Sequence, residues 1–330
     1  MPESALPRLA ILCPCHNEEA VVGPFFTRML PVMRNLSAAY RVDLVFLNNA
    51  STDDTLTRIL ALRHDWPNVY VITTSRNVGY QRSIDCGLRN ARGDLFLIID
   101  IDCEDPPELL PEFVRKFEEG FDIVYGERVD REEPAAIKRL RRYFYRILKS
   151  LADEEIILDM AEFALFSAEV RDAIAKDATS FPFVRASIGR VGFRRCGIPF
   201  KRQKRIGGES HYNLLGMTVF AVAGILSSTT LFLRLPIYLL PVWLAALAGL
   251  IVHFASTGAA WAAAAATILF AAYVGATLAF VSLYVARTYK DGLARPNALI
   301  DRRNTYAQDQ PLRPQRSVVQ SAAEVHPADR

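Results

Sequence analysis

The sequence predicts an α/β domain with a doubly wound, mostly parallel sheet, followed by a C-terminal hairpin of two transmembrane helices. Over residues 7–130, short apolar runs alternate with helical patterns, which is typical of parallel strands with helices on both faces of the sheet. Residues 235–286 contain no Asp, Glu, Lys or Arg. A soluble domain does not bury a charge-free stretch of about fifty residues, so a purely soluble protein is excluded.

The predicted strands are almost entirely apolar, because a sheet covered on both faces leaves neither side to water. The runs that meet this condition are residues 9–13, 42–47, 69–73, 95–99 and 122–125. The patterns between them predict helices at residues 19–36, 52–63, 81–90 and 108–118. Residues 134–150 indicate a basic helix. Residues 155–200 have a mixed pattern, and no element is predicted there.

Charge and hydropathy divide the chain into four parts. These are a cytoplasmic domain at 1–212, membrane-surface helices at 213–233, two transmembrane helices within 234–287 (about 235–255 and 260–286), and a basic tail at 288–330 whose end is expected to be disordered.

The topology prediction rests on the basic residues that flank the two spans. Lys and Arg lie before the first span and after the second, whereas the connecting loop at 256–259 has none. The positive-inside rule therefore predicts a multi-pass protein of the inner, cytoplasmic membrane with both termini in the cytoplasm. A third span at 213–233 would place one of the two termini outside the cytoplasm, so that segment is expected to lie on the membrane surface.

Composition also excludes several kinds of protein. The net charge is only +3, which gives no case for a nucleic-acid binder. Neither G-x-G-x-x-G nor G-x-x-x-x-G-K-[ST] occurs, so the usual dinucleotide and P-loop fingerprints are absent. The five cysteines form no disulfide framework, which indicates a reducing compartment.

Polar side chains follow four of the predicted strands. In an open parallel sheet, ligands bind at the carboxyl ends of the strands, so these side chains are expected to converge on one site. They are His16, Asn17, Glu18 and Glu19 after the first strand, Asn48 and Asn49 after the second, Arg76 and Asn77 after the third, and Asp100 and Asp102 after the fourth.

The D-x-D sequence after the fourth strand indicates a divalent cation. Asp100 follows two isoleucines and is expected to be half-buried, which requires a compensating charge. Two carboxylates can share Mg²⁺ or Mn²⁺, which then takes its other ligands from phosphates and water. Because many surface loops contain D-x-D, the sequence alone is a weak signal.

These motifs resemble those of the polyprenyl-phosphate (dolichyl-phosphate-type) glycosyltransferases of glycosyltransferase family 2. The similar stretches are 14–19 (PCHNEE), 75–81 (SRNVGYQ), 100–108 (DIDCEDPPE), 125–128 (YGER), 202–212 (RQKRIGGESHY) and 233–236 (LRLP). The resemblance implies a nucleotide-sugar-binding GT-A domain. It also implies transfer of a sugar, with inversion, from a nucleotide-diphosphate sugar to polyprenyl (undecaprenyl) phosphate, for cell-envelope glycan or lipid modification.

The resemblance assigns roles to individual residues. For the metal these are Asp100, Asp102 and Glu104; for the donor they are Pro14, Asn17, Glu18, Asn48, Arg76, Asn77 and Asp100. The expected acceptor-phosphate residues are Arg202, Arg205 and Ser210, and the expected catalytic residues are Asp102, Glu162, Arg128 and Arg131. Glu162 is expected to position or stabilise charge, since an acceptor phosphate is already largely ionised and hardly needs a base.

The chain departs from the family pattern at the donor site. Asn48 and Asn49 stand where the family usually has two aspartates, and Ala164 replaces an arginine. The donor is therefore open. UDP-glucose is the first expectation, followed by GDP-mannose and UDP-N-acetylhexosamines. A homo-oligomer is left open.

Three other functions share features with this sequence. One is a non-catalytic membrane scaffold that kept the fold, and another is a glycosyltransferase with a different lipid acceptor. A processive polysaccharide synthase would need a Q-x-x-R-W signature, and none of the three Trp residues follows an Arg.

Overall fold

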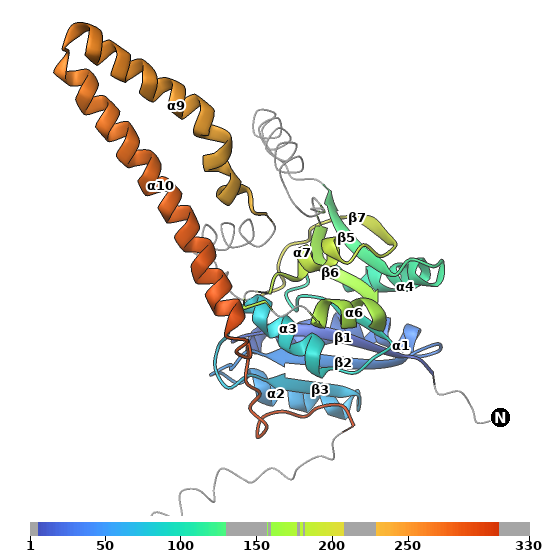
Figure 1. The fold of residues 1–330 in the computed structure, drawn as a ribbon. Coiled ribbons are helices and arrows are strands. Elements are labelled where there is room, and N and C mark those ends of the chain that lie inside the picture. Colours follow the sequence, from blue (N-terminus) through green and yellow to red (C-terminus); the bar gives the residue numbers. More distant parts are fainter. Residues whose placement is uncertain are drawn as a thin grey trace, which may run out of the picture.

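The computed structural model confirms the α/β sheet and the two long apolar helices. It describes residues 6–129, 157, 160–176, 179–180, 182–207 and 229–309. The predicted basic helix at 134–150 lies outside these residues, as do most of the expected membrane-surface segment and the end of the tail. Within the described residues the sheet has seven strands in the order β3-β2-β1-β4-β6-β5-β7 (Figure 1).

The first four strands form the predicted parallel half of the sheet. They are β1 (Arg8–Cys15), β2 (Arg41–Asn48), β3 (Val69–Thr73) and β4 (Leu95–Ile98). β1 pairs in parallel with both β2 and β4, and β2 pairs in parallel with β3. Their carboxyl ends therefore open at one edge, which places the polar residues that follow them on the same side of the domain.

The second half of the sheet is mixed. β5 (Ile123–Val129) starts one residue later than predicted and runs four residues further, β6 (Met160–Ser167) is antiparallel to β4 and β5, and β7 (Arg195–Lys201) is parallel to β5. β6 and β7 lie in the stretch for which no element is predicted. Because β6 is antiparallel, its start lies near the same edge as the ends of β4 and β5.

Helices cover both faces of the sheet, as the apolar strands require. Residues alternate in β1, so that Leu9 and Ile11 enter one apolar cluster and Ala10 and Leu12 the other. The first cluster includes residues of α1 (Glu19–Leu36), α2 (Thr55–Ala61) and α4 (Leu110–Glu118). The second includes residues of α3 (Tyr80–Asn90), α6 (Ala168–Ala175) and α7 (Val184–Arg190). Short 3₁₀ turns, η1 (Leu62–His64) and η2 (Pro107–Leu109), adjoin α2 and α4.

The two apolar helices form a hairpin that projects from the domain (Figure 1). α9 (Leu231–Thr257) begins four residues before the expected first span, and α10 (Ala260–Gly292) continues six residues past the expected second span into a polar last turn. Trp243 stacks on Tyr273 with ring centroids 4.4 Å apart, and the Tyr273 hydroxyl donates to the Pro236 carbonyl at 2.9 Å. Both helices are long and apolar enough to cross a membrane, and Val242 and Ile268 are about 70% exposed in the isolated chain.

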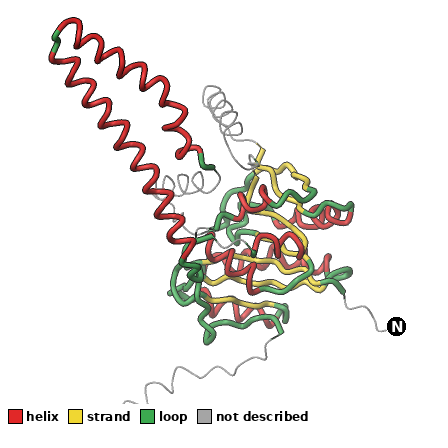
Figure 2. Tube along the Cα trace, in the orientation of Figure 1, coloured by secondary structure: helices red, strands yellow, loops and turns green. Residues whose placement is uncertain are grey.

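The segment after α10 returns to the sheet, and we call residues 293–309 the strap. The strap forms antiparallel bridges to β3 and its extension, Tyr306 with Val71 and Ile300 with Thr74. Figure 1 shows the strap running from the base of α10 past β3, and Figure 2 shows that it is loop along its course. The sequence predicts only a basic tail here, because a segment held by isolated bridges has no strand or helix period.

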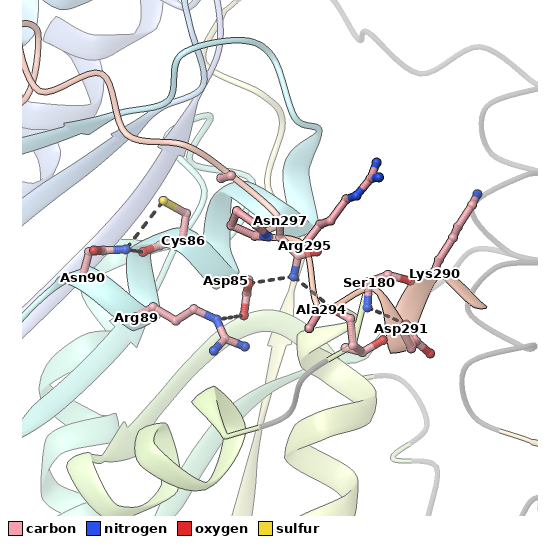
Figure 3. A pocket seen from close by; sticks show the side chains of 13 residues that line it. Asp85, Cys86, Arg89, Asn90, Ser180, Lys290, Asp291, Ala294, Arg295 and Asn297 are labelled. Carbon is pink, nitrogen blue, oxygen red and sulfur yellow. Dashed lines mark hydrogen bonds and ion pairs between the residues drawn. The ribbon is translucent and has the colours of Figure 1, made fainter. Parts of the chain in front are cut away.

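The strap begins beside α3. The Asn297 amide donates to Asp85 Oδ2 at 3.1 Å, and Arg89 Nε pairs with Asp85 Oδ1 at 2.8 Å. At the end of α10, Asp291 Oδ1 accepts from the Ser180 N–H at 2.7 Å. These contacts surround a pocket of about 260 Å³ between α3 and the strap (Figure 3). The end of the apolar helical hairpin is thus attached directly to the domain.

The strap ends on a buried carboxylate. Asp43, in the middle of β2, is fully buried and lies 3.3 Å from Arg8 Nε. The Gln308 amide donates to Asp43 Oδ2 at 2.5 Å, and Asp309 forms two bonds of 3.0 Å with the Arg8 guanidinium. Burial raises the pKa of Asp43, whereas the Gln308 amide and the Arg41 and Arg8 guanidinium groups oppose that rise.

We expect Gln308→Ala to lower the thermal stability of the protein. The change removes a donor from a buried carboxylate, which costs about 1–3 kcal/mol, or several degrees in Tm. Thermal unfolding in detergent is the measurement, and Arg303→Ala, an exposed residue of the same strap, is the control. An unchanged Tm for Gln308→Ala would show that the bond from Gln308 to Asp43 adds nothing to the stability of the domain.

Candidate active site

The carboxyl ends of the parallel strands open into a cavity of about 620 Å³. Its wall includes residues that follow β1, β2, β3 and β4, together with residues of β5, β6, α7 and the loop after β7. The predicted site residues that line it are Pro14, Glu18, Asn77, Asp100, Asp102, Glu104, Arg128, Glu162, Arg202 and Arg205. With Arg185, which was not predicted, five carboxylates and four guanidinium groups line this cavity among the residues that the structure describes.

Three expected donor residues do not line the cavity. The Asn17 side chain accepts from the Thr52 N–H at 2.8 Å, and Asn48, which is 1% exposed, accepts from the Ser51 N–H at 3.1 Å. Both amides therefore shape the loop after β2. Arg76 is exposed on the surface. Arg131 and Ser210 lie outside the described residues.

Asn49 lines the cavity and explains how the chain uses amides where the family has aspartates. Asn49 Oδ1 accepts from Thr74 Oγ1 at 3.2 Å and from the Val78 N–H at 2.8 Å, while its NH₂ donates to Asn77 Oδ1 at 2.9 Å. An ionised carboxylate could make only the accepting bonds. The amide thus joins the loops after β2 and β3 through bonds of both kinds.

Asp100 lies at the base of the cavity. The Tyr80 hydroxyl donates to Asp100 Oδ1 at 2.6 Å. Desolvation raises the pKa of Asp100 to about 7; the Tyr80 bond opposes this, and the nearby carboxylates of Asp102, Asp105 and Glu162 reinforce it. Such a group is costly to ionise unless a positive charge arrives.

The loop after β7 lies across the D-x-D segment. Two backbone bonds hold it there, from the Gln203 N–H to the Glu104 carbonyl at 2.9 Å and from the Ile206 N–H to the Asp102 carbonyl at 3.1 Å. Arg205 pairs with Glu18 at 2.7 Å and approaches Asp102 Oδ2 at 3.7 Å. Arg202 pairs with Glu104. The two arginines expected to bind the acceptor thus lie beside the residues expected to bind the metal.

Arg128 of β5 is partly buried rather than a solvated surface charge. One of its terminal nitrogens contacts both oxygens of Asp105, at 3.1 and 3.2 Å. Asp105 is 1% exposed; burial raises its pKa, whereas the charge and hydrogen bond of Arg128 oppose that rise. The pair fixes the Arg128 guanidinium at the cavity wall.

Glu162 of β6 is held by two donors. Its Oε1 accepts from the side-chain NH₂ of Gln81 at 3.0 Å and from Arg185 at 3.1 Å. The side-chain oxygen of Gln81 accepts in turn from the Val184 N–H at 3.1 Å. Gly79, with a φ of 86°, precedes α3 and turns the chain so that this helix begins at the cavity. Glu162 therefore joins β6, α3 and α7.

Several cavity residues are absent from the sequence prediction: Cys15, Gly79, Tyr80, Ser83, Ile101 and Arg185. Tyr80 belongs to the SRNVGYQ stretch, which could have been a signal. No signal in the sequence pointed to Arg185, because its helix lies in the part of the chain for which no element is predicted.

The described residues contain no group of three His, Cys, Asp or Glu side chains placed to hold a metal ion. Asp100 and Asp102 remain as a pair at the cavity base, whereas Glu104 faces Arg202. Two carboxylates fit Mg²⁺ or Mn²⁺ when substrate phosphates and water supply the other ligands.

Known proteins are similar to this chain in sequence. Residues 10–174 match the sequence profile of glycosyl transferase family 2. The chain is 30% identical to an uncharacterized glycosyltransferase of Bacillus subtilis, over 89% of this chain and 93% of that protein. It is 29% identical to a prophage bactoprenol glucosyl transferase homolog of Escherichia coli, over 70% of this chain and 76% of that protein. A solved mannosyltransferase of Pyrobaculum calidifontis, in complex with GDP-Man and Mn²⁺, aligns with 87% of the chain at 19% identity and a TM-score of 0.43.

We expect Asp100→Asn to raise the Tm of the protein in EDTA above neutral pH. The pKa of this carboxyl is about 7 in the folded protein and about 3.9 in an unfolded chain, so the folded state keeps its proton over that interval. Wild-type stability should therefore fall between about pH 4 and 7, whereas the neutral amide loses nothing. Thermal unfolding from pH 5 to 8 is the measurement.

The advantage of Asp100→Asn should grow over this range and level off above pH 7. Asp54→Asn, an exposed residue on the same edge of the sheet, is the control and should show no such growth. A difference between Asp100→Asn and wild type that is the same at every pH would contradict the raised pKa.

Proposed function

The chain belongs to glycosyl transferase family 2, and on that premise we propose that it transfers a sugar from a nucleotide-diphosphate sugar to polyprenyl phosphate at the cytoplasmic face of a membrane. The observation that carries the proposal is the cavity itself, which brings the D-x-D carboxylates together with four arginines, in a chain that also has two helices long and apolar enough to cross a membrane. The named bactoprenol glucosyl transferase homolog supports a polyprenyl acceptor. It also supports a glucose donor, so UDP-glucose stays first, before GDP-mannose and UDP-N-acetylhexosamines.

Asp100 and Asp102 would hold Mg²⁺ or Mn²⁺, which would neutralise charge on the diphosphate leaving group. Arg128 is anchored on Asp105 and can give charge-assisted bonds to the same phosphates. These three residues bind and orient the diphosphate. Arg205, between Glu18 and Asp102, can exchange its contact with Asp102 for an oxygen of the acceptor phosphate.

The acceptor would enter from the mouth. The side chain of Arg202 is 55% exposed and that of Arg205 is 25% exposed, so Arg202 is the more accessible to a phosphate whose lipid chain stays in the membrane. An oxygen of the acceptor phosphate attacks the anomeric carbon, and the bond from that carbon to the diphosphate breaks. A single in-line displacement inverts the anomeric carbon. The phosphate has a second pKa of about 6 and needs no strong base.

We expect Asp102→Asn to abolish transfer while the fold stays intact, because an amide is a poorer ligand for Mg²⁺ than a carboxylate. The assay uses a panel of nucleotide-sugars with undecaprenyl phosphate in membranes. Asp54→Asn is the matched control and should keep wild-type activity. Wild-type turnover of Asp102→Asn, or full activity of the wild type in excess EDTA, would refute the metal assignment. An inactive wild type across the whole panel would favour a scaffold.

The proposed topology has both ends of the chain in the cytoplasm. A tag in the loop at 256–259 should be accessible only from the non-cytoplasmic side, and a tag after Arg330 only from the cytoplasm, because basic residues flank the hairpin on its domain side. Labelling of tagged variants in intact and permeabilised cells is the measurement. Labelling of the two chain ends on opposite sides would mean that the segment before α9 also crosses the bilayer.

A further inference from the structure

One corner of the cavity contains buried polar atoms that have no hydrogen-bond partner in the described protein. They are Ser83 Oγ on α3, Glu162 Oε2 on β6 and Arg185 Nε on α7. Ser83 is 2% exposed and Glu162 is 7% exposed, yet all three residues line the cavity. A buried polar atom without a partner is costly, so a group that completes these bonds is expected to bind there.

The chemistry of the three atoms restricts that group. Glu162 Oε2 can only accept, and Arg185 Nε–H can only donate, whereas the Ser83 hydroxyl can do both. A fully ionised phosphate offers only acceptors and would be repelled by the Glu162 carboxylate. An uncharged ligand with neighbouring hydroxyl groups brings donors and acceptors together, and a hexose is such a ligand.

The position of the corner agrees with a sugar. Glu162 and Asp100 line the same cavity, and Tyr80, three residues before Ser83 on α3, donates directly to Asp100 at 2.6 Å. Asp100 is where the diphosphate of the donor would be held. The sugar attached to that diphosphate would therefore reach the corner formed by α3, β6 and α7.

We propose that Ser83, Glu162 and Arg185 form the subsite for the hydroxyl groups of the transferred sugar, and that Ser83 helps to determine which sugar is accepted. The inference rests on the proposed function, since it places the sugar of the same donor. Gln81 is a positioning residue in this subsite, because it occupies Glu162 Oε1 and so directs Oε2 to the ligand.

The test compares a nucleotide-sugar with the nucleotide alone. Binding of UDP-glucose, UDP, GDP-mannose and GDP is measured by calorimetry on the full-length protein in excess Mg²⁺. Ser83→Ala should weaken binding of the sugar-bearing ligand roughly two- to tenfold, the range for one uncharged hydrogen bond, and leave the nucleoside diphosphate unchanged. Glu162→Gln should weaken the same ligand more, by roughly 10- to 150-fold, because its bond involves a charge. Ser187→Ala, a buried serine of α7 outside the cavity wall, is the control.

Donors that lack one sugar hydroxyl test whether Ser83 contacts the sugar directly, because a purely structural role of Ser83 would not depend on which hydroxyl is missing. If Ser83 contacts one hydroxyl of the sugar, a donor without that hydroxyl should bind the wild type more weakly. Ser83→Ala has already lost this contact, so it should bind the deoxy donor almost as well as the complete donor. The subsite would be overturned if the affinity losses from Ser83→Ala and from the missing hydroxyl simply added for every deoxy donor. It would also be overturned if Ser83→Ala weakened binding of UDP and of UDP-glucose equally. If the wild type binds none of these four ligands and no UDP-N-acetylhexosamine, the proposed function is overturned, and the subsite with it. Sugar-specific binding without transfer to undecaprenyl phosphate would refute only the acceptor.

Discussion

The carboxylates after β4 require positive charge, because they lie at the base of a cavity where desolvation makes ionisation costly. Much of the site consists of arginines that lie beside these carboxylates. Arg128 reaches Asp105 from β5, and the loop after β7 folds back so that Arg205 meets Glu18 and Asp102. In these pairs the mixed half of the sheet supplies the cations and the parallel half supplies the anions. Glu162 of β6 is the carboxylate that the mixed half contributes, and it pairs with Arg185. Neither half alone could keep these groups ionised and near each other.

The parallel half could be predicted from sequence because its physics is local. Apolar runs of five to eight residues, each followed by polar residues, are sufficient to locate a strand and its carboxyl end. β6 escapes that rule, since Glu162 interrupts its apolar residues to face the cavity. β7 carries Arg195, Pro199 and Lys201, and it borders the sheet on one side. β6 contributes a residue to the cavity and β7 lies at the edge of the sheet, so both contain polar residues. Neither strand therefore shows the continuous apolar run by which a strand is recognised in sequence.

The strap and Arg185 were missed for a related reason. Tertiary contacts, rather than a local period, hold the strap in place. One signal was nevertheless present: Asp43 stands inside an otherwise apolar strand, and a buried carboxylate must find partners. The sequence could indicate that Asp43 needed a donor, but not that Gln308, far along the chain and beyond a membrane hairpin, would provide it.

The direct passage from α10 into the strap has a mechanical consequence. A helix that spans a bilayer tilts when the thickness of the hydrocarbon layer differs from its own apolar length. A flexible linker would absorb such a change, but here Asp291 and Asn297 fasten the helix end to Ser180 and α3 within a few residues. In the membrane topology proposed above, a tilt of α10 would therefore act directly on the edge of the sheet, and lipid composition would alter the angle between the sheet and the bilayer.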